Sequence, residues 1–265
     1  MVDTPDFERR FGGVSRLYGA AGLAKFQAAH ICVIGIGGVG SWAVEALARN
    51  AIGTITLIDL DNIAESNVNR QIHALDDNFG KAKVTAMAER IYAINPAAKV
   101  HEIEDFVSTE NVEVMLANGF DVILDAIDDA KAKVAIAAYC KTHQIPLISV
   151  GGAGGRLDPT KIKVADLASV AGDRLLAKVR NQLRRDHAFP KGNDAAKKQL
   201  KFGIQAVYSD EQMIAPISNS KNTVDSCEVE AGITGLNCAG FGSSVSVTAP
   251  FGFTAAQLVF NELLK

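Results

Sequence analysis

The chain has 265 residues, of which 48% are hydrophobic and 22% charged, so it can bury a packed core and is not an intrinsically disordered protein. Its net charge is only −3, and a polyanionic partner would therefore have to meet a local basic patch. The four cysteines are scattered without a C-x-x-C pair, which favours a reducing, cytoplasmic compartment and argues against structural zinc.

The chain begins with a predicted helix and a strand that leads into a glycine-rich turn. Residues 1–8 are acidic and lack an apolar run, so we expect no signal peptide, and residues 8–26 have a helical pattern. The apolar run 31–34 is followed by Gly35, Gly37 and Gly40, which match G-x-G-x-x-G. Such glycines permit a tight turn, the close approach of a phosphate and tight helix–strand packing, while the first amides of the next helix face the anion. The pattern predicts a nucleotide site without specifying the nucleotide.

A second strand and a long polar loop follow. The strand 54–59 ends on Asp59, 19 residues after Gly40, where a ribose-binding carboxylate is expected; an ordinary strand-end acid is the alternative. The loop 61–71 is longer and more polar than a compact α/β unit needs, which indicates a functional segment. Lys83 lies in the first turn of the next predicted helix, against the helix dipole, so it has either a phosphate nearby or a solvated side chain.

The following residues alternate between strands and helices. We expect strands at 99–104, 121–125 and 146–150, and helices at 108–118 and 130–143. Asp128 follows a strand at the edge where parallel sheets bind ligands and is a candidate Mg²⁺ ligand, whereas Asp129 is a candidate helix cap. This alternation predicts an α/β fold with a Rossmann-like, doubly wound, mostly parallel sheet. We assign residues 1–155 to the nucleotide-binding domain and 156–265 to a C-terminal α+β extension packed on the same body.

The second half contains a strongly basic segment. After a predicted strand at 162–165, a helix begins at Asp173, and residues 174–201 contain nine Lys or Arg against two Asp. A cationic segment in a net acidic chain fits contact with a nucleic-acid backbone, while a solvated helix face is the alternative. The candidate contacts are Arg174, Lys178, Arg180, Arg184 and Arg185.

Residues 231–261 contain no charged side chain. Their glycines, Pro250 and hydroxyl residues interrupt any continuous apolar helix, so we expect no membrane span and no membrane association. We predict instead a buried strand at 244–248 and a helix at 254–264, in the core or at a subunit interface.

The combined motifs resemble the nucleotide site of the ubiquitin-activating-enzyme-like superfamily, which includes bacterial adenylyltransferases of molybdopterin and thiamine biosynthesis. The residues that carry the resemblance are Gly35, Gly37, Gly38, Gly40, Asp59, Asp61, Asn67, Arg70, Gln71, Lys83 and Asp128. The resemblance implies ATP·Mg²⁺ and activation of a carboxylate. It places Asp59 on the ribose and Asp128 on Mg²⁺. The phosphates would contact Asn67, Arg70 and Lys83, so that Arg70, Lys83 and Asp128 are the candidate catalytic residues.

The chain also departs from those biosynthetic enzymes. It lacks their paired C-x-x-C zinc site. The resemblance implies a homodimer in which a partner subunit supplies an arginine near the N-terminus, for which Arg10 and Arg16 are candidates. The segments 173–180, 207–211 and 240–243 resemble a branch of the superfamily that modifies tRNA. That branch implies ATP-dependent cyclisation of N6-threonylcarbamoyladenosine beside the anticodon, with loss of water, and makes the basic segment a tRNA contact.

Cys227 and Cys238 are candidates for a covalent intermediate or for sulfur relay with a cysteine-desulfurase system; packed thiols are the alternative. Three other functions compete with tRNA cyclisation. An activator of a ubiquitin-like sulfur-carrier protein would explain the nucleotide motifs but not the basic helix. A dinucleotide dehydrogenase would leave Arg70, Lys83 and Asp128 without roles. A non-catalytic RNA- or partner-binding module would explain the basic helix but would make the ATP site vestigial.

Overall fold

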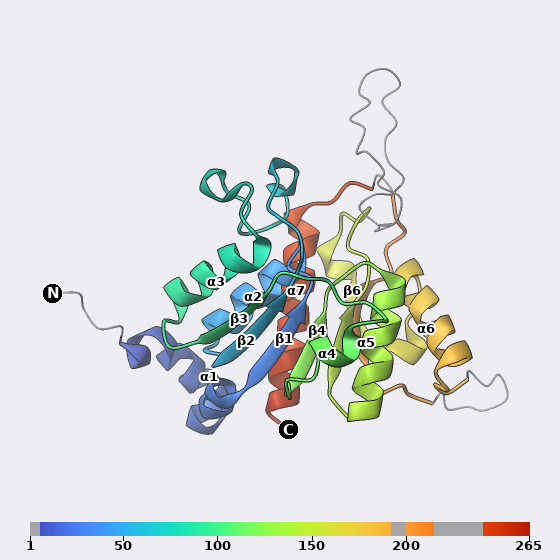
Figure 1. The fold of residues 1–265 in the computed structure, drawn as a ribbon, viewed down its shortest axis with the longest axis horizontal. Coiled ribbons are helices and arrows are strands. Elements are labelled where there is room, and N and C mark those ends of the chain that lie inside the picture. Colours follow the sequence, from blue (N-terminus) through green and yellow to red (C-terminus); the bar gives the residue numbers. More distant parts are fainter. Residues whose placement is uncertain (1–5, 192–199, 215–240) are drawn as a thin grey trace, which may run out of the picture.

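One seven-stranded sheet forms the centre of the molecule (Figure 1). This computed structural model describes residues 6–191, 200–214 and 241–265. The strand order is β3-β2-β1-β4-β5-β7-β6, and every neighbouring pair is parallel except β6 with β7. The strands are β1 (His30–Ile34), β2 (Thr54–Ile58), β3 (Lys99–Ile103), β4 (Val122–Asp125), β5 (Leu147–Val150), β6 (Ile162–Asp166) and β7 (Gln205–Ser209). The prediction of a doubly wound, mostly parallel α/β fold is confirmed.

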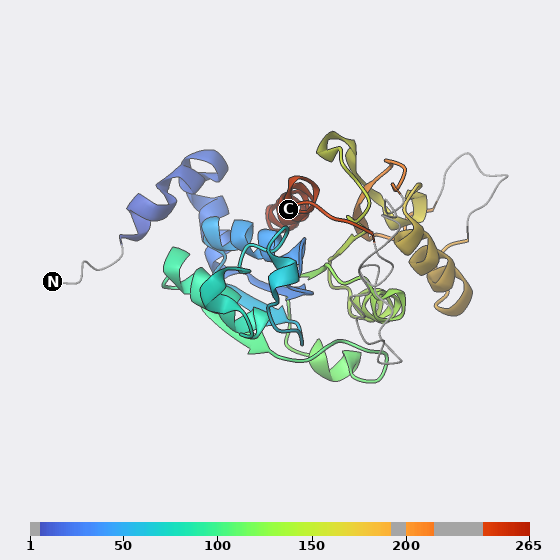
Figure 2. The same cartoon turned by 90° about the horizontal axis from the view of Figure 1, so that it is seen from above.

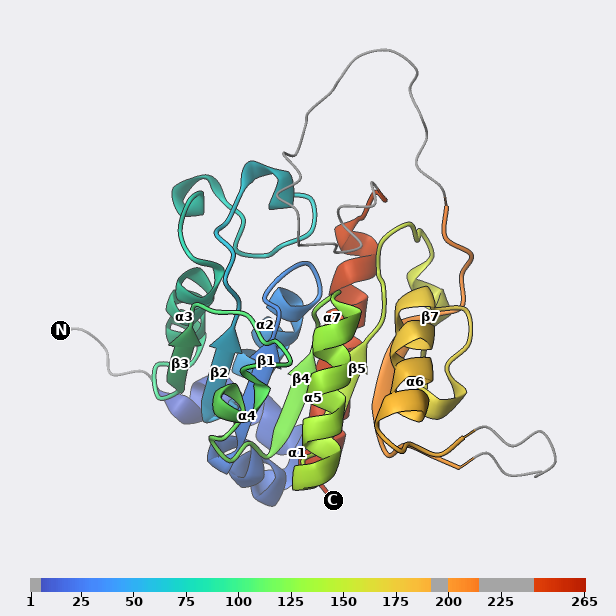
Figure 3. The same cartoon turned by 45° about the vertical axis from the view of Figure 1, so that its right-hand side comes forward.

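Helices cover both faces of the sheet (Figures 2 and 3). One face packs against α1 (Phe7–Ala28), α2 (Gly40–Arg49), α3 (Lys83–Ile94) and α7 (Val245–Leu263). The other packs against α4 (Val112–Met115), α5 (Ala130–His143) and α6 (Arg174–Asp186). The resulting three layers enclose two hydrophobic cores, one on each side of the sheet.

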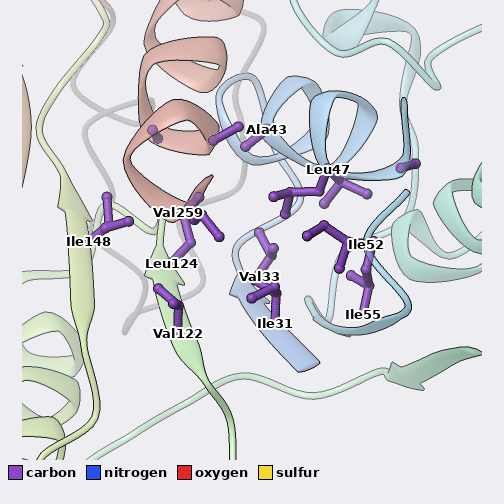
Figure 4. Close-up of a cluster of buried hydrophobic side chains, with 14 of the residues drawn as sticks. Ile31, Val33, Ala43, Leu47, Ile52, Ile55, Val122, Leu124, Ile148 and Val259 are labelled. Carbon is purple, nitrogen blue, oxygen red and sulfur yellow. The ribbon is translucent and has the colours of Figure 1, made fainter. Parts of the chain in front are cut away.

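The strand sequences account for these two cores. Ile31 and Val33 of β1 lie in the core shared with α2 and α7, whereas Cys32 and Ile34 lie in the core on the opposite face. Because side chains alternate between faces, a strand buried on both sides is apolar at every position. Figure 4 shows the first core, where Val33 lies near Leu47 of α2 and Val259 of α7.

Two predicted elements differ from the structure. The helix expected at 108–118 is reduced to α4, because the Asn111 amide accepts from the Ser108 N–H and donates to the Phe106 carbonyl, which favours a turn. The strand expected at 244–248 is wrong, since Ser244 caps the start of α7. Val247, Phe251 and Ala255 are fully buried at helical spacing, so packing overrides the β preference of alternating Val and Ser.

The C-terminal extension contributes to the same sheet and the same helix layers as the first half. β7 pairs with β5, and α7 packs on α2. The proposed division after residue 155 remains a prediction. None of the helices within the described residues is long and apolar enough to cross a membrane.

α7 approaches the start of α2 closely at Gly252. A Cβ atom at this position would lie 2.5 Å from the Val39 carbonyl oxygen and 2.9 Å from the Ala43 amide nitrogen. Since both atoms belong to the backbone, a side chain can fit only if the two helices separate.

We therefore expect Gly252→Ala to lower the free energy of unfolding by about 1–3 kcal/mol, the usual cost of overpacking. Urea denaturation of the variant and of Gly242→Ala measures this effect. A Cβ at Gly242 would meet no atom of the described residues within 4 Å, so that control should unfold at the wild-type urea midpoint. Equal midpoints for all three proteins would contradict a tight α2–α7 contact.

Candidate active site

The glycine-rich turn connects β1 to α2 at the carboxyl edge of the sheet. Gly35 has a φ of 87°, and its amide donates to the Ile58 carbonyl of β2 at 2.9 Å. A Cβ at Gly40 would lie 1.8 Å from the Gly35 carbonyl oxygen, so only glycine allows this close packing. Among the described residues, the atom nearest to a Cβ at Gly37 would be the Gln71 amide nitrogen, 3.9 Å away. The turn is therefore tight at both ends and open in the middle, as phosphate binding requires.

Asp59 and Lys83 flank this turn. The Asp59 carboxylate accepts from the Ile36 N–H at 2.6 Å and from the Asp61 N–H at 2.9 Å. Burial raises the pKa of Asp59, while Lys83 opposes that rise. The Lys83 ammonium lies 2.6 Å from Asp61 Oδ2 and 3.8 Å from Asp59 Oδ1, and its side chain is only 6% exposed. A solvated side chain, one of the two alternatives for Lys83, is therefore wrong.

The loop after β2 places Arg70 over the glycine-rich turn. Asn67 Oδ1 accepts from the Ala64 N–H at 3.0 Å, which fixes the loop rather than leaving this atom free for a ligand. A Cβ at Gly38 would lie 3.2 Å from both Cγ and Cδ of Arg70. The structure thus brings Arg70, Asp59 and Lys83 to the same edge as the turn.

A buried ion pair supports the loop that carries Asp128. Lys133 of α5 donates to Asp125 Oδ2 at 2.8 Å, and the Ser149 hydroxyl donates to the same oxygen at 2.9 Å. The Lys133 and Asp125 side chains have no exposed surface. The other Asp125 oxygen accepts from the Ile127 N–H at 3.2 Å, just before Asp128. Sequence reasoning missed this cluster, for which an acid ending the apolar β4 run was the only signal.

Asp128 itself is half-buried and makes no hydrogen bond or ion pair with any described residue. No group of three or more His, Cys, Asp or Glu side chains within the described ranges could hold a metal ion alone. A single free carboxylate at a phosphate site nevertheless fits Mg²⁺, because this ion is commonly held by one or two carboxylates together with substrate phosphates and water. The predicted Asp129 cap is confirmed, with Oδ1 accepting from the Ala132 N–H at 2.7 Å.

Several buried side chains near this edge, among them His73 and Gln71, have polar atoms without a hydrogen-bond partner among the described residues. His73 is 1% exposed, and neither ring nitrogen has a hydrogen-bond partner in the part of the chain that the structure describes. Burial, together with Lys83 and Arg90, lowers the pKa of His73 to about 4, so the ring is neutral at pH 7. Gln71 is also buried, with an unpaired Oε1. The burial of His73 beside Lys83 and Arg90 could not be predicted from the sequence, because an isolated histidine in a core is common and forms no recognisable motif.

The five basic candidates on α6 fall into two groups. Arg180 donates to the Val170 carbonyl, and Arg184 donates to the carbonyls of Ala168 and Pro190, both at 3.2 Å. Arg174, Lys178 and Arg185 are exposed, and their spacing places them along one side of the helix. Arg185 pairs with Asp186, whereas Arg174 and Lys178 have no carboxylate partner within the described residues. This exposed row, Arg174, Lys178 and Arg185, is called the basic stripe below.

The two candidate arginines near the N-terminus, Arg10 and Arg16, are not brought to this edge of their own chain. Arg10 donates to the carbonyls of Ala93 and Ile94 at the C-terminal end of α3, a whole helix length from Lys83 at its start. Arg16 lies on the same helix as Arg10, near Gly12 and Gly13. Cys227 and Cys238 lie outside the described residues.

The family model of the ThiF family matches residues 11–250, which include the glycine-rich turn and all seven strands. The chain belongs to the ThiF family. Within it, the chain is 47% identical over 266 residues to the tRNA threonylcarbamoyladenosine dehydratase of Haemophilus influenzae, covering 100% of this chain and 97% of that relative. The chain is also 47% identical, over 268 residues and with the same coverage, to the Escherichia coli enzyme of the same name.

A solved structure shows the same architecture. The crystal structure of the E. coli tRNA N6-threonylcarbamoyladenosine dehydratase in complex with ATP superposes with a TM-score of 0.84 at 44% sequence identity. The match covers 99% of this chain and 97% of that one. Since similarity extends over the whole length, it includes the basic second half as well as the nucleotide-binding edge.

We expect Lys133→Met to destabilise the protein by about 3–5 kcal/mol, because it leaves the buried Asp125 carboxylate without its counterion. Denaturant unfolding at pH 7 measures the loss. The double variant Lys133→Met with Asp125→Asn removes both charges and should recover most of the lost stability. A double variant as unstable as the single one would contradict the ion-pair explanation.

Proposed function

We propose that this protein uses ATP to activate the threonyl carboxylate of N6-threonylcarbamoyladenosine in tRNA, next to the anticodon, and cyclises that side chain with net loss of water. The observation that carries this proposal is the whole-length similarity to dehydratases of that name. The carboxyl edge of the sheet, with its glycine-rich turn, would bind the ATP that this reaction uses. The basic stripe on α6 would contact the RNA backbone.

The proposed reaction has two steps. A carboxylate oxygen of the threonyl group attacks a phosphorus atom of ATP, and the phosphate leaving group departs with its bonding electrons. A ureido nitrogen of the same side chain then attacks the activated carbonyl carbon, loses its proton and expels the phosphorylated oxygen. Both the α- and the γ-phosphorus are possible points of attack: the first expels pyrophosphate and the second expels ADP. Ring closure is fast in this scheme because both reacting groups belong to one nucleotide.

The described side chains fit the charges that these steps develop. The Arg70 guanidinium suits a forked contact with phosphate oxygens, and the Lys83 ammonium a point contact. Lys83 is paired with Asp61, whose side chain is 73% exposed, so a phosphate can replace this carboxylate without leaving a buried charge behind. Asp59 would accept from the ribose hydroxyls, the role that an acid at the end of this strand has in dinucleotide-binding folds. Asp128 would hold Mg²⁺, which neutralises phosphate charge when bound.

Further parts of the proposal concern assembly and location. We propose a cytoplasmic homodimer. In it, Arg10 or Arg16 of one subunit reaches the ATP site at the carboxyl edge of the other subunit's sheet. Neither arginine reaches the glycine-rich turn of its own chain. A thiol role for Cys227 or Cys238 and an exchange of sulfur with a desulfurase system stay predictions.

Activation of a ubiquitin-like sulfur carrier is the second candidate function. The same phosphate-binding edge would serve it, because that reaction also activates a carboxylate with ATP. It gives no role to the basic stripe, and for this reason we favour the tRNA reaction.

We expect the purified protein, given ATP·Mg²⁺ and tRNA that contains N6-threonylcarbamoyladenosine, to convert this nucleoside into a product lighter by one water. Mass spectrometry of the digested tRNA measures the product, and phosphate or pyrophosphate release measures ATP use. Unmodified tRNA is the control and should give neither. ATP consumption stimulated only by a carrier protein with a C-terminal glycine would overturn the tRNA proposal in favour of the alternative.

We expect the triple variant Arg174→Gln, Lys178→Gln and Arg185→Gln to bind tRNA at least tenfold more weakly while binding ATP normally. Because each phosphate contact releases counterions, the slope of log affinity against log salt should fall by about 2. Filter binding at several salt concentrations measures both quantities.

The matched control is Arg9→Gln, Lys25→Gln and Lys99→Gln, which removes the same charge from exposed positions outside α6. Similar tRNA binding by the two triple variants would show that only net charge matters and would remove the basis for the stripe.

A further inference from the structure

Asn69 lies directly before Arg70 in the loop after β2 and contacts both Arg70 and the start of α7. We propose that Asn69 is a positioning residue that holds the Arg70 guanidinium with its free edge available for the phosphates of ATP. The inference rests on the proposed ATP-dependent function and names a residue that the motif reasoning left without a role.

Within the described residues, the hydrogen bonds of the Arg70 guanidinium all involve one terminal nitrogen, Nη1. Arg70 Nη1 donates to the Ser66 carbonyl at 2.8 Å and to Asn69 Oδ1 at 3.0 Å. Its Nε and Nη2 atoms have no partner among the described residues. These two nitrogens form the side edge of the guanidinium, whose parallel N–H bonds match two oxygens of a phosphate. The hydrogen bonds to Nη1 therefore leave both Nε and Nη2 available to bind two oxygens of a ligand.

Asn69 is in turn fixed by α7. Its Nδ2 donates to the Ser243 carbonyl at 2.7 Å, and its own backbone carbonyl accepts from the Val245 N–H at 3.1 Å. Ser243 and Val245 lie on either side of Ser244, the residue that caps α7. Both the backbone and the side chain of Asn69 are thus held, although its side chain lies on the exposed surface.

This arrangement matters because arginine is a long side chain with many rotamers. Its stem already lies over Gly38, where a Cβ would be 3.2 Å from Cγ and Cδ. With the stem and Nη1 both held, little rotational freedom remains to be lost when a phosphate binds, and such preorganisation strengthens binding. Asn69 makes this contribution through Arg70 and need not touch the nucleotide.

The test separates the two contacts of the Asn69 side chain. Asn69→Ala removes both the acceptor for Arg70 and the donor to Ser243. Asn69→Asp keeps an acceptor for Arg70 but loses the donor. We expect Asn69→Ala to raise the Kd for ATP by about tenfold, and Asn69→Asp to stay within about threefold of the wild type, since one charge-assisted hydrogen bond orients the guanidinium. Calorimetric titration with ATP·Mg²⁺ measures Kd, and steady-state kinetics should show the change in KM for ATP rather than in kcat.

A double-mutant cycle with Arg70→Ala tests whether Asn69 acts through Arg70. In the Arg70→Ala background, Asn69→Ala should have less than a twofold further effect on Kd, because the group that it orients is absent. Asn118→Ala is the matched control, since Asn118 is exposed and makes no hydrogen bond with a described residue. The control should bind ATP as the wild type does.

Three results would overturn the inference: wild-type ATP affinity for Asn69→Ala, equally weak binding by the Ala and Asp variants, or an undiminished effect of Asn69→Ala without Arg70. Equal weakening of Ala and Asp would assign the role to the α7 contact alone. Absence of ATP binding by the wild type would instead overturn the proposed function, so the two failures are distinguishable.

Discussion

The structure depends on one close contact between backbone atoms, that of Gly40 with the Gly35 carbonyl. A Cβ at Gly40 would lie 1.8 Å from that oxygen, so no other residue permits α2 to start so near the end of β1. Because α2 begins there, its first amides point out of the carboxyl edge of the sheet. The carboxyl ends of β1, β2 and β4 meet at this edge, which brings Asp59 and Asp128 to the same opening.

The cations around this opening already have oxygen partners before any nucleotide arrives. Lys83 lies against Asp61 and Asp59, Arg70 is held by Ser66 and Asn69, and Lys133 is paired with Asp125. These pairs of cation and oxygen differ in how far they are exposed to solvent. The Lys133 side chain is completely buried and supports the β4–α5 loop, whereas the Asp61 side chain is exposed to solvent. An arrangement of charges fixed in advance reduces the reorganisation that a reaction would otherwise require.

Local sequence predicted the sheet, the glycine-rich turn, the Asp129 cap and the basic helix, because strand periodicity, glycine spacing and capping act over a few residues. It failed where distant residues decide the outcome. Alternating Val and Ser at 244–248 favoured a strand, yet contact with α2 makes this segment helical. The contact of Asn69 with Ser243 spans 174 residues, and the His73 environment depends on Lys83 and Arg90. The separation of Arg180 and Arg184 from the basic stripe likewise needed the fold, since sequence shows charge but not its partners.

The packing of α7 on α2 also has a consequence for the order in which the chain can fold. Proteins are synthesised from the N-terminus, and the first strands and helices of this fold leave the ribosome well before residue 245. Until then the glycine-rich turn lacks the surface on which it rests at Val39, and Asn69 lacks its partner at Ser243. A nascent chain that has completed β1 to β5 therefore presents the nucleotide motifs without the assembled site. The site is therefore complete only when α7 is in place, after the strands that carry its motifs have been synthesised.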